Sequence, residues 1–258
     1  MAGPLHRVVD RPAEGAPRLV LVHGFTQTME SWGPPVGLLT DAFETVRVDL
    51  PGHGGSSDVR LGFVETAAAI GDAGGTATYV GYSLGGRLCL RLALDRPDLV
   101  EALVLVGASP GLADRAEREA RRRADEALAD EIERTGTAVF LARWLAQPLF
   151  ASFTPVAADL EARLANRPAG LAAALRSLGT GAQEPLRSRL AELSMPVLAV
   201  AGQDDERYAR LAEEMAAAIG ANAEVVAIAG AGHAAHLEQP EAFARAVAGF
   251  LVRHPPTP

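Results

Sequence analysis

The chain has 258 residues, of which 48% are hydrophobic and 22% are charged, as is typical of a globular protein with a sizeable core. Its formal net charge of −8 argues against general nucleic-acid binding, which needs a basic surface. The sequence contains no lysine, so all 24 basic residues are arginines. The absence of lysine excludes a pyridoxal cofactor held as a Schiff base and a nucleotide-binding P-loop.

The cysteine content and the first residues of the chain indicate the cellular compartment in which we expect the protein. A single cysteine, Cys89, excludes an internal disulfide and a cysteine-rich zinc site. Residues 1–5 contain no apolar segment typical of a signal peptide, and no run of about 18 apolar residues predicts a membrane span. We therefore expect a cytoplasmic protein with no membrane partner, while the sequence does not indicate its oligomeric state.

Short apolar runs alternate with helix-length segments along the chain. Strands are predicted at Leu5–Val9 (an edge strand), Arg18–His23, Phe43–Leu50, Thr78–Tyr82, Ala102–Gly107, Pro196–Ala201 and Ala223–Ile228. Helices between them include Gly86–Asp95, Arg207–Ile219 and Pro240–Arg253. The apolar runs are continuous rather than alternating, which is typical of strands buried on both faces of a parallel sheet. The pattern predicts an α/β fold with a mostly parallel, doubly wound sheet.

One interval, from Gly111 to about Leu193, contains proline-broken helical patterns and no strand candidate. It is far longer than an ordinary connection of about 2–6 residues. We interpret it as a helical cap inserted after the Ala102–Gly107 strand. The predicted organisation is a core of residues 1–110 and 194–254, a cap of residues 111–193, and a disordered tail of residues 255–258.

A candidate nucleophile lies in Gly81-Tyr82-Ser83-Leu84-Gly85, which fits the pattern G-x-S-x-G. The motif follows a predicted strand and opens a predicted helix, and this context makes it informative. Small glycines permit a sharp strand-to-helix turn that exposes the serine hydroxyl. We expect the backbone N–H of Leu84 to face an oxyanion that develops beside Ser83.

A second match to the same pattern, Gly107-Ala108-Ser109-Pro110-Gly111, also follows a strand. Its serine is followed by proline, which has no N–H to donate to an oxyanion and which disfavours helix at Ser109. We therefore interpret Ser109 as a strand-end residue that lines the site rather than a nucleophile.

A serine nucleophile needs a base and an acid, which follow it in the order Asp or Glu, then His. His233 comes just after the last strand, between glycine and alanine residues, and is the candidate base. His236 lies three residues further on, but no third ligand is placed nearby, so we expect no metal. The preceding strand ends at three carboxylates, Asp204, Asp205 and Glu206, among which composition alone does not choose.

The second oxyanion donor should come from the turn after an early strand. The segment His23-Gly24-Phe25-Thr26 follows such a strand, and its glycine permits a tight turn. We expect the N–H of Phe25 to be the donor and His23 to be structural.

From Leu19 to the last helix, these motifs resemble the α/β-hydrolase family. More narrowly, the chain resembles the 2-succinyl-6-hydroxy-2,4-cyclohexadiene-1-carboxylate synthases of menaquinone biosynthesis. Many esterases share the hydrolase motifs, so the cap motifs and Arg87 carry the narrower resemblance. The matching segments are His23–Phe25, Leu50–Ser56, Gly81–Arg87, Ala108–Leu112, Arg121–Asp125 and Trp144–Ala151.

The resemblance implies a lyase that eliminates pyruvate from 2-succinyl-5-enolpyruvoyl-6-hydroxy-3-cyclohexene-1-carboxylate, without a metal or organic cofactor. It selects Asp205 as the acid of the triad. It assigns Arg87 and Arg121 to the carboxylates of this small tricarboxylate substrate, and Tyr82 and Trp144 to its binding site. Local arginines agree with the charge of such a substrate, since the guanidinium group binds carboxylates bidentately.

Two other functions remain open at this point. A small-molecule carboxylesterase would use the same Ser83, Asp205 and His233, and it would differ in its substrate. A catalytically silent binding protein with this fold is a different class, against which the complete set of three residues argues.

Overall fold

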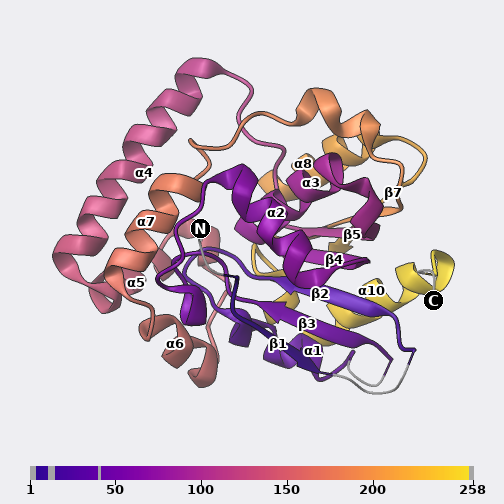
Figure 1. Ribbon diagram of the computed structural model, residues 1–258, viewed down its shortest axis with the longest axis horizontal. Coiled ribbons are helices and arrows are strands. Elements are labelled where there is room, and N and C mark those ends of the chain that lie inside the picture. The colour runs from indigo at the N-terminus through magenta and orange to yellow at the C-terminus, as the bar shows by residue number, and fades with distance from the viewer. Residues whose placement is uncertain (1–3, 11–14, 40–41, 256–258) are drawn as a thin grey trace.

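The computed structural model describes residues 4–10, 15–39 and 42–255 (Figure 1). The predicted tail, residues 255–258, lies outside the described residues except for Pro255. None of the helices within these ranges combines the length and the apolar character that crossing a membrane requires.

A seven-stranded sheet forms the centre of the molecule, in the order β1-β3-β2-β4-β5-β6-β7. All neighbouring strands are parallel except β1, which pairs antiparallel with β3 at one edge. The strands are β1 (Arg7–Asp10), β2 (Arg18–Val22), β3 (Glu44–Val48), β4 (Ala77–Tyr82), β5 (Val100–Val106), β6 (Val197–Gly202) and β7 (Ala223–Ile228).

Helices cover both faces of the sheet because alternate strand residues point to opposite sides. On β2, Val20 and Val22 belong to a core shared with α2, α3 and α8, whereas Leu19 and Leu21 belong to a core shared with α1 and α10. Cys89 of α3 is fully buried in the first of these two cores. The covering helices are α1 (Gly33–Val36), α2 (Phe63–Gly74), α3 (Leu84–Asp95), α8 (Glu206–Ile219), α9 (Ala235–Glu238) and α10 (Pro240–Arg253).

The predicted α/β fold is confirmed, and each of the seven predicted strands is present with ends shifted by at most two residues. The edge strands differ from the expectation of burial on both faces. Side chains of β1 and β7 alternate between partly buried and more exposed positions, because each of these strands has a neighbour on one side only. Helix α3 begins two residues earlier than predicted, directly after Ser83.

Between β5 and β6 the chain forms the predicted helical insertion, which lies at one end of the molecule in Figure 1. Its helices share a small core of their own, to which α4, α5 and α7 contribute Ile132, Phe140 and Leu175, and Phe25 of the sheet domain packs against it. The helices are α4 (Arg115–Thr135), α5 (Thr137–Leu145), α6 (Ala157–Leu164) and α7 (Pro168–Leu178). Short 3₁₀ turns lie at Met29–Trp32, Gly54–Ser56, Pro97–Leu99, Pro148–Phe150 and Arg187–Glu192.

Candidate active site

Ser83 occupies the turn between β4 and α3, with φ of 49° and ψ of −106°, a conformation that is rare for any residue other than glycine. The flanking glycines make this turn possible. A Cβ on Gly81 would lie 2.6 Å from the backbone of Gly85, and a Cβ on Gly85 would lie 2.1 Å from the carbonyl oxygen of Val22. The pattern G-x-S-x-G therefore reflects close packing of α3 onto the sheet, which leaves Ser83 exposed to the cavity.

His233 lies in the turn after β7 and contacts two of the candidate residues. Its Nδ1 is 2.8 Å from Oδ2 of Asp205, and its Nε2 is 3.3 Å from Oγ of Ser83. A neutral imidazole with its proton on Nδ1 donates to the carboxylate and accepts from the serine hydroxyl. In this arrangement Ser83 can pass a proton to His233, while Asp205 stabilises the imidazolium that results.

Of the three carboxylates after β6, the structure brings only Asp205 to His233. Asp205 is buried, whereas Asp204 and Glu206 are exposed. Asp205 is also the N-cap of α8, because its Oδ1 accepts a hydrogen bond from the N–H of Tyr208 at 3.2 Å. The helix start thereby fixes the carboxylate whose other oxygen faces the imidazole.

The two expected oxyanion donors, Phe25 and Leu84, both line the cavity beside Ser83. Neither backbone N–H donates a hydrogen bond within the described part of the chain, so both are available to a ligand. Leu84 is the first residue of α3, where no intrahelical acceptor exists. The carbonyl of Gly24, in the same peptide unit as the N–H of Phe25, accepts from Nδ1 of His23 at 2.8 Å, which gives His23 the structural role expected for it.

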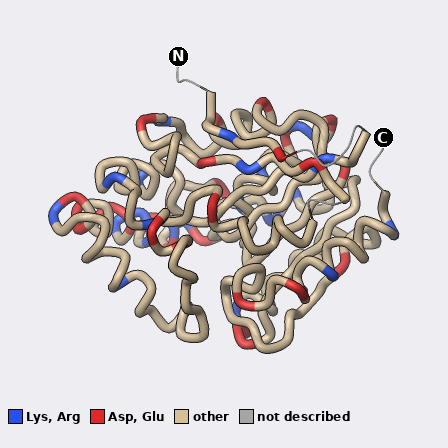
Figure 2. Tube along the Cα trace, turned by 90° about the horizontal axis from the view of Figure 1, so that it is seen from below, with Lys and Arg blue, Asp and Glu red and all other residues tan. Residues whose placement is uncertain are grey.

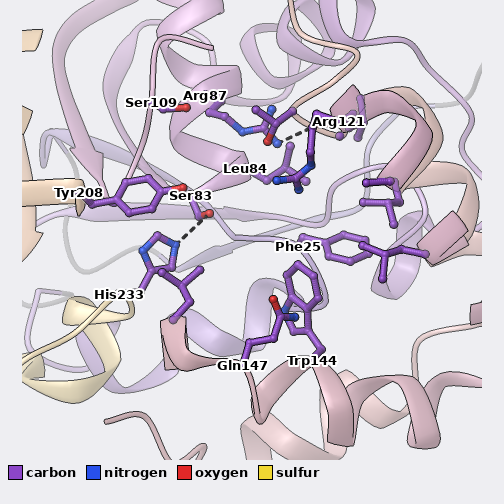
Figure 3. Close-up of a pocket in the computed structure, with 18 of the residues that line it drawn as sticks. Phe25, Ser83, Leu84, Arg87, Ser109, Arg121, Trp144, Gln147, Tyr208 and His233 are labelled. Carbon is purple, nitrogen blue, oxygen red and sulfur yellow. Dashed lines mark hydrogen bonds between the residues drawn. The ribbon is translucent and has the colours of Figure 1, made fainter. Parts of the chain in front are cut away.

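A cavity of about 770 Å³ opens between the sheet and the cap, with Ser83 and His233 in its wall (Figure 3). Most of the charged residues that line it are basic. The chain as a whole differs, since it carries a net charge of −8 and its basic and acidic residues are mixed along much of the trace (Figure 2). The ionisable lining residues other than His233 are Arg87, Arg121, Arg163, Arg207, Glu117 and Tyr82 with Tyr208. The interior therefore favours an anionic ligand.

Arg87 and Arg121 lie on one side of the cavity, opposite Trp144 and Gln147 (Figure 3). Arg87 is buried and donates to Oε1 of Gln183 at 2.9 Å and to the carbonyl of Leu178 at 3.0 Å. No carboxylate of the described residues lies within ion-pair distance of it. Burial, with a smaller effect of Arg121, lowers the pKa of Arg87 to about 10, so it remains charged at neutral pH.

Arg121 has a partner, since its Nε lies 2.7 Å from Oδ1 of the buried Asp125 one helical turn further along α4. Its side chain is 40% exposed, and the other guanidinium nitrogens can reach the cavity that it lines. Asp125 also accepts from the N–H of Gly181 at 3.2 Å, which ties α4 to the segment after α7.

Both aromatic residues expected at the site line the cavity. Tyr82 packs with its ring centroid 5.4 Å from that of His233, and burial raises the pKa of Tyr82, so its phenol stays neutral. Trp144 packs edge-on against Phe25 at 5.3 Å, and its buried Nε1 has no acceptor among the described residues. These contacts place one aromatic ring beside His233 and one beside Phe25.

His236, the other histidine of the last loop, lies in α9 and is fully buried between Trp32 and Tyr82, at 4.6 and 4.4 Å between ring centroids. Burial keeps the pKa of His236 well below 6.5, so the ring is uncharged. It packs against the back of the site and does not line the cavity.

Several lining residues were not singled out by the sequence. Arg163 of α6 is buried, lies 2.7 Å from Oδ2 of Asp159, and donates to Oγ1 of Thr26 at 3.1 Å. Tyr208 packs its ring 4.4 Å from that of His233. Neither belongs to a motif with a chemical meaning, and the i, i+4 spacing of Asp159 and Arg163 is common on solvated helices. Ser109 lines the cavity, as expected. The serine within hydrogen-bond distance of His233 is Ser83.

The comparisons with known proteins agree with this geometry. The profile of the alpha/beta hydrolase family matches residues 19–246. The 2-succinyl-6-hydroxy-2,4-cyclohexadiene-1-carboxylate synthase of Klebsiella pneumoniae (strain 342) is 34% identical over 257 residues, which cover 96% of this chain and 98% of that protein. The synthase of Serratia proteamaculans (strain 568) is 32% identical over 255 residues, covering 95% and 97%.

Among solved structures, that of MenH from S. aureus superposes with a TM-score of 0.88 at 31% identity, over 96% of this chain and 98% of that chain. A thermophilic esterase from Thermogutta terrifontis shares the fold with a TM-score of 0.79 at 24% identity. The chain therefore belongs to the α/β-hydrolase family and is similar, along nearly its whole length, to its 2-succinyl-6-hydroxy-2,4-cyclohexadiene-1-carboxylate synthases.

Proposed function

We propose that the protein is a carbon–oxygen lyase that eliminates pyruvate from 2-succinyl-5-enolpyruvoyl-6-hydroxy-3-cyclohexene-1-carboxylate in menaquinone biosynthesis. The full-length similarity to synthases from several bacteria supports this proposal. The small basic cavity beside a serine and a histidine supports it as well. The proposal needs neither a metal nor an organic cofactor, because the chemistry is a proton transfer followed by loss of a leaving group.

In the proposed reaction, Ser83 removes the proton from the ring carbon that carries the succinyl carbonyl and passes its own proton to His233. The electron pair of the broken C–H bond forms a ring double bond, and the existing double bond shifts by one position. The bond between the ring and the enolpyruvyl oxygen then breaks, and the expelled enolate takes a proton to become pyruvate, while the imidazolium of His233 gives up a proton and returns to its neutral form. Negative charge develops on the succinyl carbonyl oxygen, where the N–H groups of Phe25 and Leu84 would stabilise it.

The observation that carries the proposal is the burial of Arg87 without an ion-pair partner among the described residues. Burying a guanidinium is unfavourable unless an opposite charge compensates it. Within the described residues, Arg87 donates hydrogen bonds to two neutral acceptors and lies over the ring of Phe63, 5.6 Å from its centroid. It lies four residues after Ser83 on α3 and faces the same cavity. A neutral ester would leave this charge without a counter-ion, whereas a substrate carboxylate would supply one.

Substitution of Arg87 by alanine tests the proposal. A hydrogen bond to a charged group contributes about 1.5–3 kcal/mol, so kcat/KM for pyruvate release should fall by about tenfold to over a hundredfold. Hydrolysis of a neutral p-nitrophenyl ester should change by much less. Pyruvate is measured with a coupled NADH assay. The matched control is Arg91→Ala, one turn further along α3, where the arginine pairs with Asp95 and Glu184 and does not line the cavity.

An esterase is the alternative with the same triad. Fast hydrolysis of p-nitrophenyl esters without pyruvate release from the enolpyruvoyl substrate would establish that alternative. Equal losses of Arg87→Ala on charged and neutral substrates would show that the arginine is structural.

A further inference from the structure

Thr26, directly after the expected oxyanion donor Phe25, has φ of 68°, which is unusual for a β-branched residue. Such a conformation persists only where the surroundings determine it. All three polar groups of Thr26 are held by separate residues. Its N–H donates to Nε2 of His53 at 3.3 Å, its carbonyl accepts from Nδ2 of Asn166 at 2.9 Å, and its Oγ1 accepts from Arg163 at 3.1 Å.

Two of these three contacts come from the cap rather than from the sheet domain. Arg163 belongs to α6, and Asn166 follows it before α7 begins. Asn166 is 3% exposed and is fixed on each side. Its Oδ1 accepts from the N–H of Gly54 at 2.9 Å, and its own carbonyl accepts from Oγ1 of Thr137 at 2.7 Å. The side-chain amide of Asn166 therefore joins the cap to two loops of the sheet domain, the one that contains Phe25 and Thr26 and the one that contains Gly54.

We propose that Asn166 is a positioning residue that, through the carbonyl of Thr26, holds the segment that carries the Phe25 N–H. The inference rests on the role of this N–H in the proposed function. Peptide units are planar, so the N–H of Phe25 points opposite to the carbonyl of Gly24, which His23 and Gln27 hold at 2.8 and 3.2 Å. On the other side, Asn166 holds Thr26. Phe25 lies between these two anchors, and loss of either one lets the chain relax from the unusual conformation.

The substitution Asn166→Asp isolates one contact. The carboxylate keeps an acceptor for the N–H of Gly54, but it replaces the donor that faces the carbonyl of Thr26. Asn166→Ala removes both contacts without placing a buried charge, and it keeps the test decisive where the aspartate variant does not fold. The matched control is Asn222→Asp, since Asn222 also donates to backbone carbonyls, those of Leu193 and Met195 at 2.9 and 2.6 Å, before β7 and away from the cavity.

The readouts use oxyanion formation at Ser83 and do not need the natural substrate. They are hydrolysis of p-nitrophenyl acetate and the rate at which diisopropyl fluorophosphate modifies Ser83, a step that forms a P–O bond and expels fluoride. Complete loss of one oxyanion donor costs about 10²–10³-fold, so a misdirected donor should lower kcat and the modification rate by about ten- to a hundredfold. KM for the ester should change by less than about twofold, because the ester's binding groups are untouched.

A pH series separates positioning from general destabilisation. Burial raises the pKa of a carboxyl group, so lowering the pH should protonate the aspartate and restore an O–H donor toward Thr26. The rate of Asn166→Asp relative to wild type should therefore recover at acidic pH, while that of Asn166→Ala should stay low. Asn222→Asp should lower the urea midpoint and leave the rates of the folded enzyme unchanged.

Wild-type rates in folded Asn166→Asp or Asn166→Ala would overturn the inference, as would equal rate losses in Asn222→Asp. Failure of the proposed function has a different signature: the wild type would react with both probes yet release no pyruvate. In that case the Asn166 variants would still test the positioning of Phe25.

Discussion

Asp205 contacts two partners with its two carboxylate oxygens: Oδ1 caps α8, and Oδ2 faces Nδ1 of His233. These contacts have different chemical requirements. Any side-chain oxygen of this length can cap the helix, and asparagine caps as well as aspartate. Only an acceptor beside Nδ1 keeps the imidazole in the tautomer that can take a proton from Ser83, and only a charge stabilises the imidazolium.

Asp205→Asn should therefore abolish most of the activity without a large loss of stability. The equivalent change in a serine protease costs about 10⁴-fold in turnover because the histidine adopts the wrong tautomer, and we expect a loss of orders of magnitude here. Steady-state kinetics together with urea unfolding would test both parts. Asp204→Asn, on the exposed neighbour, is the matched control and should leave turnover within a few-fold of wild type. An inactive Asp204→Asn beside an active Asp205→Asn would contradict the assignment.

The residues of the site differ in how well the sequence alone reveals them. Ser83 and His233 follow strands and lie within two residues of glycines, so their chemistry and their backbone requirements coincide in a recognisable pattern. Asp205 was one of three adjacent carboxylates, and the position at which α8 begins distinguishes it in the structure. Arg163 and Asn166 carry no local pattern, because their partners, Asp159 and Thr26 respectively, act from a helix face and from a loop remote in sequence.

At the scale of elements, the site depends on how closely α3 approaches the sheet. Gly85 lies where a Cβ would meet the carbonyl carbon and oxygen of Val22 on β2, at 2.6 and 2.1 Å. Backbone atoms in the middle of a sheet cannot move aside as a flexible side chain can. The helix start, and with it the N–H of Leu84, is therefore set by glycine packing against β2.

Gly85→Ala should destabilise the fold by at least about 1–3 kcal/mol, the typical cost of overpacking. It should also slow the reaction at Ser83, because α3 is pushed outward. The control is Gly33→Ala in α1, where nothing lies within 4 Å of the added Cβ. Urea unfolding of both variants measures the difference. Equal stability of the two would show that β2 and α3 adjust to the extra methyl group.

The strands were predictable because most of them are buried on both faces, so continuous apolar runs mark them. Continuous apolar runs mark the edge strands less clearly, and β1 begins two residues later than its apolar pattern predicts. The cap was predicted as helical without the bounds of its helices. Its small core is assembled from α4, α5 and α7 together. The longest of these helices, α4, has no broad apolar face, because it buries only Asp125, Ala129 and Ile132.

At the scale of the whole molecule, three buried histidines link folding to protonation. Burial lowers the pKa of His23, takes that of His53 to about 3, and keeps that of His236 well below 6.5. His23 and His53 each use one ring nitrogen to accept a backbone N–H, which a protonated ring cannot do. These three imidazole rings are therefore neutral in the folded protein.

Stability should fall as the pH drops below about 6.5. There the unfolded chain binds protons that the folded protein does not, so each such histidine lowers the free energy of unfolding by up to about 1.4 kcal/mol per pH unit. For His53 the loss continues until about pH 3, and above pH 6.5 its contribution is complete. Urea unfolding at a series of pH values measures the slope. His53→Gln should make it shallower, and an unchanged slope would contradict the assignment.

Cys89 is a natural probe of how often the core of the protein opens. It is the only thiol of the chain, it lies fully buried on α3, and burial raises its pKa. A thiol reagent can reach it only when the core between α3 and the sheet opens, so its labelling rate in native conditions measures how often that happens. The same measurement made with a saturating ligand would report, in one unmodified protein, how strongly occupancy of the cavity suppresses the opening of the core.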